Sequence, residues 1–142
     1  MKMLTKAEII AKLEKIGLKT GDKVMVHSSL SSLGWVDGGA ETVIDALLEV
    51  IGETGTLLMP ALTSGSKENP YEGIQTPSYL GQITEAFRRR PEVKRSFHPT
   101  HSVLALGKDA EALIADHIKA ESACGLGTPY YKLAEVGGSV LL

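Results

Sequence analysis

The sequence predicts an α/β fold with three layers, in which helices cover both faces of a mainly parallel central sheet. Two observations carry this prediction. Short, continuous apolar runs at residues 24–26 and 56–59 are typical of strands that are buried on both faces. Between these runs, residues 40–51 carry apolar side chains at helical spacing. The predicted order is therefore strand, helix, strand, which is the order of a parallel βαβ unit.

A further helix is expected before the first of these strands, over residues 5–16. Thr5 and Glu8 have the spacing of a capping box, and Gly17 is a natural end for the helix. The side chains expected to form its buried stripe are Ile9, Ile10, Leu13 and Ile16.

The second half of the chain continues to alternate between helices and strands. Three arginines, Arg88 to Arg90, end the first of these helices, where their charges complement the helix dipole. The apolar patterns place helices over 79–90, 108–118 and 130–136, and strands over 102–106 and from 139 onward.

The last four residues have the pattern of the opening of a buried strand. A complete domain rarely stops inside a core strand, because an open sheet edge and apolar surface would result. We therefore expect residues 1–142 to be the N-terminal part of a single domain that is truncated at its C-terminus. An unfinished edge of this kind also favours self-association as a homodimer.

Composition narrows the classes of function. The formal charge of −2 argues against a nucleic-acid-binding protein, which would usually show a strongly basic face. Cys124 is the single cysteine, so the chain has neither an internal disulfide nor a cysteine-based zinc site. No apolar run approaches the length that spans a membrane, and the first residues are charged and amphipathic, unlike a signal peptide. The cytoplasm is the expected compartment.

Residues 27–39, between the first strand and the helix at 40–51, form the most informative stretch. His27 is followed by four serines and then by three glycines. A strand, a loop of small residues and a helix present backbone N–H groups and hydroxyls to an anion, so a phosphate-bearing ligand is one interpretation. The other is an ordinary polar loop whose serines and glycines make turns, because neither a Walker motif nor a dinucleotide fingerprint is present.

Residues 62–77 are a long loop after the carboxyl end of the second strand, the edge where open α/β sheets bind ligands. Glu68 and Glu72 lie in this loop. They are either solvated loop charges or an acidic rim for a cationic substrate.

His98 and His101 flank Pro99, but no carboxylate or cysteine accompanies them, so a metal site is not expected. His98 is either a structural residue of a proline turn or a site histidine beside Arg95 and Ser96, which add an anion binder and a hydroxyl. A serine hydrolase is disfavoured because no G-x-S-x-G elbow is present.

With these residues in view, the chain resembles the aminoglycoside 3-N-acetyltransferase family, of the antibiotic N-acetyltransferase type. The matching segments follow the family's order and cover nearly the whole chain. They are VHSSLSSLGWVDGGA (26–40), GTLLMPALT (55–63), TPSYLGQITEAFRRRPEVKRSFHPTHSVLALG (76–107), GTPYYKL (127–133) and GGSVLL (137–142).

The resemblance implies transfer of the acetyl group of acetyl-CoA to the 3-amino group of an aminoglycoside, a resistance activity that needs no metal. It implies that Arg95, Ser96 and His98 match an R-S-x-H-P element on the CoA side of the site. It also implies that the residues next to the cofactor are Ser28, Ser29, Leu30, Ser31, Ser32, Leu33, Gly34, Val36 and Gly38.

The family's general-base histidine follows the G-G-x-V-L-L segment, so the resemblance places it beyond residue 142. His98 is the catalytic candidate within this chain, although nothing promotes it to the role of that base. Glu68 and Glu72 are the acidic candidates for binding the aminoglycoside. A noncatalytic CoA-binding module, or an incomplete half-enzyme, is the alternative function.

Overall fold

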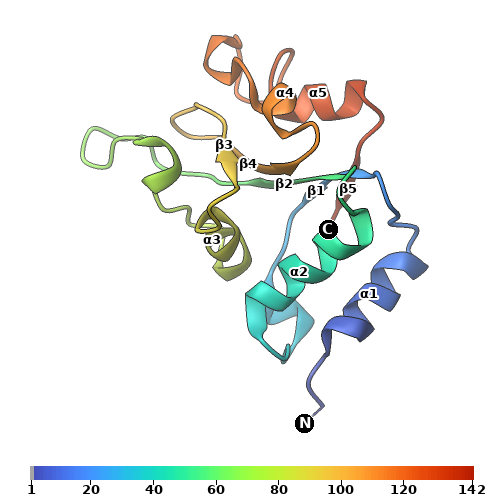
Figure 1. Cartoon of the computed structure of the whole chain (residues 1–142). Helices are drawn as coiled ribbons and strands as arrows, with labels where there is room; N and C mark the ends of the chain where they lie inside the picture. The colour runs from blue at the N-terminus through green and yellow to red at the C-terminus, as the bar shows by residue number, and fades with distance from the viewer. Residues whose placement is uncertain (1) are drawn as a thin grey trace.

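Five strands form one mixed sheet in this computed structural model, which describes residues 2–142 (Figure 1). Across the sheet the strand order is β3-β4-β2-β1-β5. The strands are β1 (Lys23–Val26), β2 (Thr56–Pro60), β3 (Lys94–Arg95), β4 (Val103–Gly107) and β5 (Ser139–Leu141).

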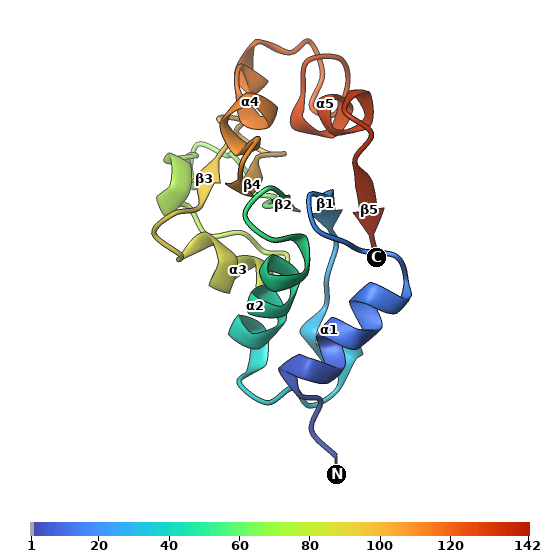
Figure 2. The same ribbon diagram turned by 45° about the vertical axis from the view of Figure 1, so that its right-hand side comes forward.

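Helices cover both faces of this sheet. Figure 1 shows α1, α2 and α3 on one face and α4 and α5 on the other, and Figure 2 shows the same division from a second direction. The α-helices are α1 (Lys6–Lys15), α2 (Gly39–Ile51), α3 (Gln82–Arg88), α4 (Ala110–Ile114) and α5 (Pro129–Glu135). The 3-10 turns are η1 (Leu30–Leu33), η2 (Gly73–Gln75) and η3 (His117–Lys119).

The βαβ prediction is confirmed, because β1 pairs in parallel with β2 through the crossover helix α2. The prediction of a mainly parallel sheet is wrong for this part of the chain, since β4 pairs antiparallel with both β2 and β3. The short connection between β3 and β4 allows only an antiparallel hairpin. The apolar run in β4 did not reveal this direction, because a continuous apolar pattern reports burial on both faces and not strand orientation.

The core lies in two clusters, one on each face of the sheet. Leu57 and Met59 of β2 pack against the α1–α3 face, whereas Leu58 between them packs against the α4–α5 face. All three side chains have no exposed surface. The prediction that these strands are buried on both faces is therefore confirmed.

β5 is the exception to this burial. The predicted strand forms and pairs in parallel with β1, but it lies at the outer edge of the sheet, where Val140 is 58% exposed. The expectation that these residues form a buried strand is therefore wrong for the described structure, because β1 is the only strand beside β5.

The local signals for both ends of α1 are confirmed, since the helix ends at Lys15 and Gly17 follows with φ of 101°, but its buried face is shorter than predicted. Thr5 Oγ1 accepts a hydrogen bond from the Glu8 N–H at 3.3 Å, and Glu8 Oε2 accepts one from the Thr5 N–H at 2.9 Å, which is the predicted capping box. Ile9 and Leu13 are buried as expected. Ile16 is 65% exposed, because the helix ends before it can bring this side chain onto the buried face.

The predicted helix over 108–118 is broken in two. α4 ends at Ile114, and Asp116 adopts a left-handed conformation with φ of 60° before η3 begins. This break turns the chain so that His117 is buried.

Candidate functional site

The serine loop, residues 27–38, connects β1 to α2. Its middle winds into η1, where the hydroxyls of Ser29 and Ser31 lie 2.9 Å apart. Gly34 and Gly38 both have positive φ, of 77° and 79°, which side-chain-bearing residues rarely adopt. At Gly38 a Cβ atom would also lie 2.2 Å from Thr42 Oγ1. These glycines therefore set the path of the loop into α2.

A cavity of about 600 Å³ opens between the serine loop and the start of α3; we call it the serine-loop cavity. Six of the residues predicted to bind a cofactor line it: Ser28, Ser29, Leu30, Ser31, Gly34 and Val36. The remaining lining residues, which the sequence did not single out, are Trp35, Gly39, Leu80, Gly81 and Gln82. Of the other predicted loop residues, Ser32 and Leu33 line a separate apolar groove beside α1, and Gly38 lines neither.

Ser28 is the distinctive residue of this cavity. Within residues 2–142, its Oγ is the one buried side-chain polar atom without a hydrogen-bond partner. The backbone N–H groups of Ser28 and Ser29 also donate to no acceptor in the described part of the chain. A buried polar group without a partner costs about 1–3 kcal/mol, so it marks a place where a ligand is expected to supply the partner.

A second hollow, of about 460 Å³, is formed by the acidic loop, residues 62–77, together with Ser78 and Tyr79; we call it the acidic hollow. It brings Glu68 and Glu72 together, as a rim for a cationic substrate requires. None of its lining residues in the described structure is a lysine, an arginine or a histidine.

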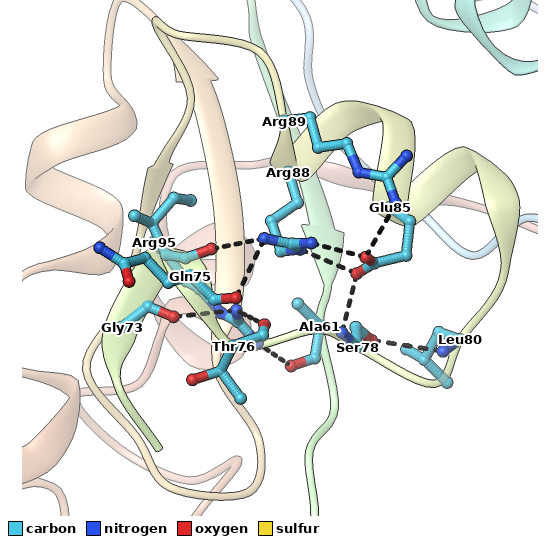
Figure 3. Close-up of polar contacts among 11 residues, drawn as sticks. Ala61, Gly73, Gln75, Thr76, Ser78, Leu80, Glu85, Arg88, Arg89 and Arg95 are labelled. Atoms are coloured by element: carbon cyan, nitrogen blue, oxygen red, sulfur yellow. Dashed lines mark hydrogen bonds and ion pairs between the residues drawn. The ribbon is translucent and has the colours of Figure 1, made fainter. Parts of the chain in front are cut away.

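The two hollows share one wall, because Ser78 and Tyr79 line the acidic hollow while Leu80 to Gln82 line the serine-loop cavity. This wall is held in place by hydrogen bonds. The Ser78 N–H donates to Glu85 Oε1 of α3 at 2.8 Å, and the Leu80 N–H donates to Ser78 Oγ at 3.3 Å (Figure 3).

Arg95 fixes the acidic loop to the sheet. Its guanidinium donates to the Ala61 carbonyl at 2.9 Å and to the carbonyls of Gly73 and Thr76 (Figure 3). It also donates to Ser102 Oγ at 2.9 Å. Burial lowers the pKa of Arg95 from its ordinary value. The side chain lines neither hollow, so the structure shows it holding protein carbonyls, and its predicted contact with a cofactor stays a prediction.

The other arginines of this region form specific ion pairs. Arg88 pairs with Glu85 at 2.7 Å and donates to the carbonyls of Ile74 and Gln75, which ties the acidic loop to α3 (Figure 3). Burial alone would raise the pKa of Glu85, but the hydrogen bonds from Arg88 and from the Ser78 N–H lower it below its ordinary value. Arg90 reaches across to α2, where it pairs with Glu41 and Asp45.

The predicted site residues Ser96 and His98 lie in a separate cluster beside β4. Ser96 Oγ accepts from the Val103 N–H and lies 2.8 Å from Nδ1 of His117. The His98 ring stacks on His117 at 4.6 Å, and His98 Nδ1 accepts the N–H of His101 at 3.0 Å. Burial lowers the pKa of both His98 and His117, which favours the neutral form of both rings.

This cluster is distinct from both hollows, since neither Ser96 nor His98 lines them. The sequence did not identify the polar partners of His117. Its Nε2 lies 2.9 Å from the Ala123 carbonyl, in a loop with no regular pattern. Within residues 2–142 no three histidine, cysteine or carboxylate side chains come together in a way that could hold a metal ion. Over the same residues, no helix is long and apolar enough to cross a membrane.

Comparisons with known proteins give one consistent answer. The family model described as aminoglycoside 3-N-acetyltransferase matches residues 25–142. The SPbeta prophage-derived aminoglycoside N(3')-acetyltransferase-like protein YokD of Bacillus subtilis (strain 168) is 43% identical over 136 residues, which cover 80% of this chain and 50% of that protein. Aminoglycoside N(3)-acetyltransferase VII of Streptomyces paromomycinus is 38% identical, with coverage of 98% and 55%.

Solved structures agree with the sequence relatives. The apoenzyme of aminoglycoside acetyltransferase AAC(3)-IVa has a TM-score of 0.90 at 31% identity, covering 100% of this chain and 56% of that one. AAC-IIIb, solved as a binary complex with CoASH, has a TM-score of 0.85 at 30% identity, covering 98% and 59%. The chain thus spans little more than half the length of these relatives. A family match over residues 25–142, carried on the same fold, shows that the chain belongs to the aminoglycoside 3-N-acetyltransferase family.

Proposed function

We propose that this chain provides the cofactor-binding part of an acetyl-CoA-dependent N-acetyltransferase that acts on the 3-amino group of aminoglycosides, and so confers resistance. The observation that carries the proposal is the unpartnered, buried Oγ of Ser28 at a cavity of about 600 Å³. Family membership supplies the reaction class, and the structure of AAC-IIIb with CoASH shows that a relative binds this coenzyme.

The donors of the serine loop suit a phosphorylated, amide-rich ligand. The hydroxyls of Ser28, Ser29 and Ser31 and the free N–H groups at the start of the loop are neutral donors at the carboxyl end of β1. These donors carry no charge, and the fold holds them in position. They can therefore bind a diphosphate or an amide without an ion pair within the protein first being broken. CoA, when bound, supplies the acetyl group activated as a thioester. Arg95 and Ser96 remain predicted contacts on the same side.

The acidic hollow is proposed to hold the aminoglycoside. Such a substrate carries several ammonium groups, and Glu68 and Glu72 provide negative charge where no cation of the protein lines the hollow. The shared wall of Ser78 to Gln82 separates the two hollows, so an amine held on one side lies next to the cofactor cavity on the other.

Transfer is proposed to be direct. A neutral histidine accepts a proton from the amine as the amine lone pair attacks the acetyl carbonyl, and N–H donors stabilise the oxyanion that develops. When this oxyanion collapses, the C–S bond of the thioester breaks, the amide forms, and CoA leaves as a thiolate that takes the proton from the histidine. None of the residues that line the serine-loop cavity is a histidine or a carboxylate. His98 lies elsewhere, so we place the general base beyond residue 142. The complete domain is proposed to be a three-layer α/β/α structure, with this chain as its N-terminal part.

The absence of a titratable group among the residues that line the serine-loop cavity also supports the second candidate. In that case the chain is a noncatalytic CoA-binding module, or a half-enzyme that needs another chain. The open edge at β5, where Val140 is 58% exposed, is the surface through which a homodimer would form. In either case the cytoplasm, where CoA is abundant, is the proposed compartment.

Isothermal titration of the purified chain with CoA tests the proposal. A saturable heat of binding is expected, and its absence at millimolar CoA would contradict both candidate functions. A second measurement, thiol release from acetyl-CoA in the presence of an aminoglycoside, then separates the two candidates. We expect binding with little or no thiol release from residues 1–142 alone. Fast turnover would show that the base lies within this chain.

A further inference from the structure

Trp35 is an aromatic side chain presented on a fixed backbone. Its indole is 65% exposed, and it is the only tryptophan of the chain. Its carbonyl accepts a hydrogen bond from the Leu4 N–H at 2.7 Å, and Leu4 pairs with Val36 in a parallel bridge. Figures 1 and 2 both show the segment before α2 beside the start of α1. The fold therefore holds an open aromatic face at the end of the serine loop.

Gly34 and Trp35 form a ridge between two hollows. On one side lies the serine-loop cavity, and on the other a hollow of about 380 Å³ that we call the basic hollow. The basic hollow is lined, besides this ridge, by Lys2, Met3, Leu4, Glu8, Lys12 and Leu33.

The side chains that line the basic hollow leave a net positive charge. Glu8 is paired with Lys2 at 2.6 Å, and this contact lowers the pKa of Glu8 to about 2. Lys12 has no ion-pair partner among residues 2–142. One ammonium group is thus left for an anion next to the open face of Trp35.

Three hollows therefore follow one another along the molecule with changing charge. The acidic hollow carries Glu68 and Glu72, the serine-loop cavity carries no charged side chain, and the basic hollow carries the free Lys12. This order matches a cationic amine at one end and an anionic, aromatic group at the other. CoA has such a group in its adenosine 3′-phosphate.

We propose that Trp35 stacks on the adenine of CoA and that Lys12 pairs with the 3′-phosphate, so that the ridge and the basic hollow form the nucleotide subsite. This inference rests on the proposed function, because it assigns the far end of the coenzyme that the serine loop binds. Stacking on an aromatic ring suits adenine, and a flexible ammonium group suits a phosphate that remains partly in water.

The fluorescence of the single tryptophan tests this assignment directly. CoA and dephospho-CoA are expected to quench the emission of Trp35 strongly, whereas 4′-phosphopantetheine, which lacks adenosine, is expected to quench it much less, because it contacts Trp35 only from the serine-loop cavity. Titration calorimetry on the same samples gives the dissociation constants. Equal quenching by 4′-phosphopantetheine would overturn the assignment of Trp35 to adenine.

Two variants separate the two contacts. Trp35→Ala is expected to weaken CoA binding about 10-fold and Trp35→Phe about 2-fold, with a smaller effect of either on 4′-phosphopantetheine. Lys12→Gln is expected to weaken CoA about 3-fold at low salt and to leave dephospho-CoA unchanged. Tyr131→Ala on α5 and Lys15→Gln on α1 are matched controls, since neither residue lines a hollow of this row.

The outcomes distinguish this inference from the function on which it rests. If wild-type protein binds CoA but its emission does not change and Trp35→Ala binds equally well, the nucleotide subsite is wrong and the proposed cofactor binding stands. If no CoA binding is detected, both are wrong. Circular dichroism confirms the folding of each variant. Should Trp35→Ala unfold, the wild-type fluorescence and Trp35→Phe still decide the question.

Discussion

The serine loop and the acidic loop follow the neighbouring parallel strands β1 and β2, yet they use their polar groups in opposite ways. In the acidic loop, carbonyls of the chain accept from Arg95 and Arg88, and the Ser78 N–H is bound to Glu85. In the serine loop, the buried Ser28 Oγ has no partner within residues 2–142.

Under the proposed function, this difference separates a loop that supports the fold from a loop that binds the ligand. A polar group that is satisfied inside the protein contributes to stability and has little left to offer a ligand, whereas an unsatisfied one costs stability until a ligand arrives. Substitutions in the acidic loop's arginine network should therefore lower stability. Substitutions at the unsatisfied serine should lower affinity.

The largest expected effect follows from Arg95→Met. The substitution removes hydrogen bonds to Ser102 and to three carbonyls, of which that of Ala61 belongs to a fully buried residue. We expect a loss of about 3 kcal/mol in the free energy of unfolding, measured by urea denaturation.

Arg89→Met is the matched control for that loss, because Arg89 is 71% exposed and lies 3.9 Å from Glu85. A change within about 0.5 kcal/mol is expected there. If Arg95→Met were instead as stable as wild type but unable to bind CoA, the contrast between a structural acidic loop and a ligand-binding serine loop would be contradicted. Arg95 would then bind the cofactor, as the resemblance implied.

The next largest effect is expected at two glycines whose φ angles are nearly the same. Gly38 in the serine loop has φ of 79°, and Gly73 in the acidic loop has φ of 73°. A Cβ at Gly38 would lie 2.2 Å from Thr42 Oγ1, whereas nothing lies within 4 Å of one at Gly73. Gly73→Ala should cost about 1 kcal/mol in thermal unfolding from backbone strain alone, and Gly38→Ala about 2 kcal/mol. Equal losses would show that Thr42 moves aside freely.

Glu85→Gln is expected to cost about 1 kcal/mol at pH 7, because it weakens the bonds to Arg88 and Ser78. The pKa of Glu85 is lowered from 4.5 in the folded state, so the unfolded chain binds more protons below that pH. The stabilisation is therefore complete above pH 4.5 and is lost as the pH falls through the folded pKa. Urea titrations at descending pH should show the variant and wild type converging; a constant gap would contradict this origin.

How far the sequence predicts the fold depends on how local each signal is. The capping box of Thr5 and Glu8 and the buried faces of β1 and β2 follow from neighbours in the chain, and the structure confirms them. The antiparallel direction of β4 follows from its short connection to β3, a two-residue strand that the apolar pattern did not predict. The apolar pattern does not report the break at Asp116 either, because it continues as a helix to residue 118.

The candidate site likewise has residues that the local sequence reveals and residues that it does not. The serine loop is visible in the sequence because small residues between a strand and a helix have a recognisable spacing. The wall at Leu80 to Gln82 is not, since it joins the cavity only through contacts between elements far apart in sequence. Arg95 is the opposite case. Its motif indicates a contact with the cofactor, which stays a prediction, whereas the structure shows its donors bound to the carbonyls of Ala61 and Gly73, which the sequence did not reveal.

The smallest expected effect is at Ser28. It is the sharpest test of the comparison, because the substitution should raise the stability of the free protein and lower its affinity for CoA. Ser28→Ala removes the buried unpartnered hydroxyl, so the unfolding free energy without ligand should rise by about 0.5–1 kcal/mol. The same change removes a donor to the cofactor, so the affinity for CoA should fall about 5-fold. Thermal unfolding and titration calorimetry measure the two effects, and Ser139→Ala, on the exposed edge strand, should change neither. If Ser28→Ala lowered stability instead, the hydroxyl would have a partner inside the protein, and the serine loop would be scaffold like the loop beside it.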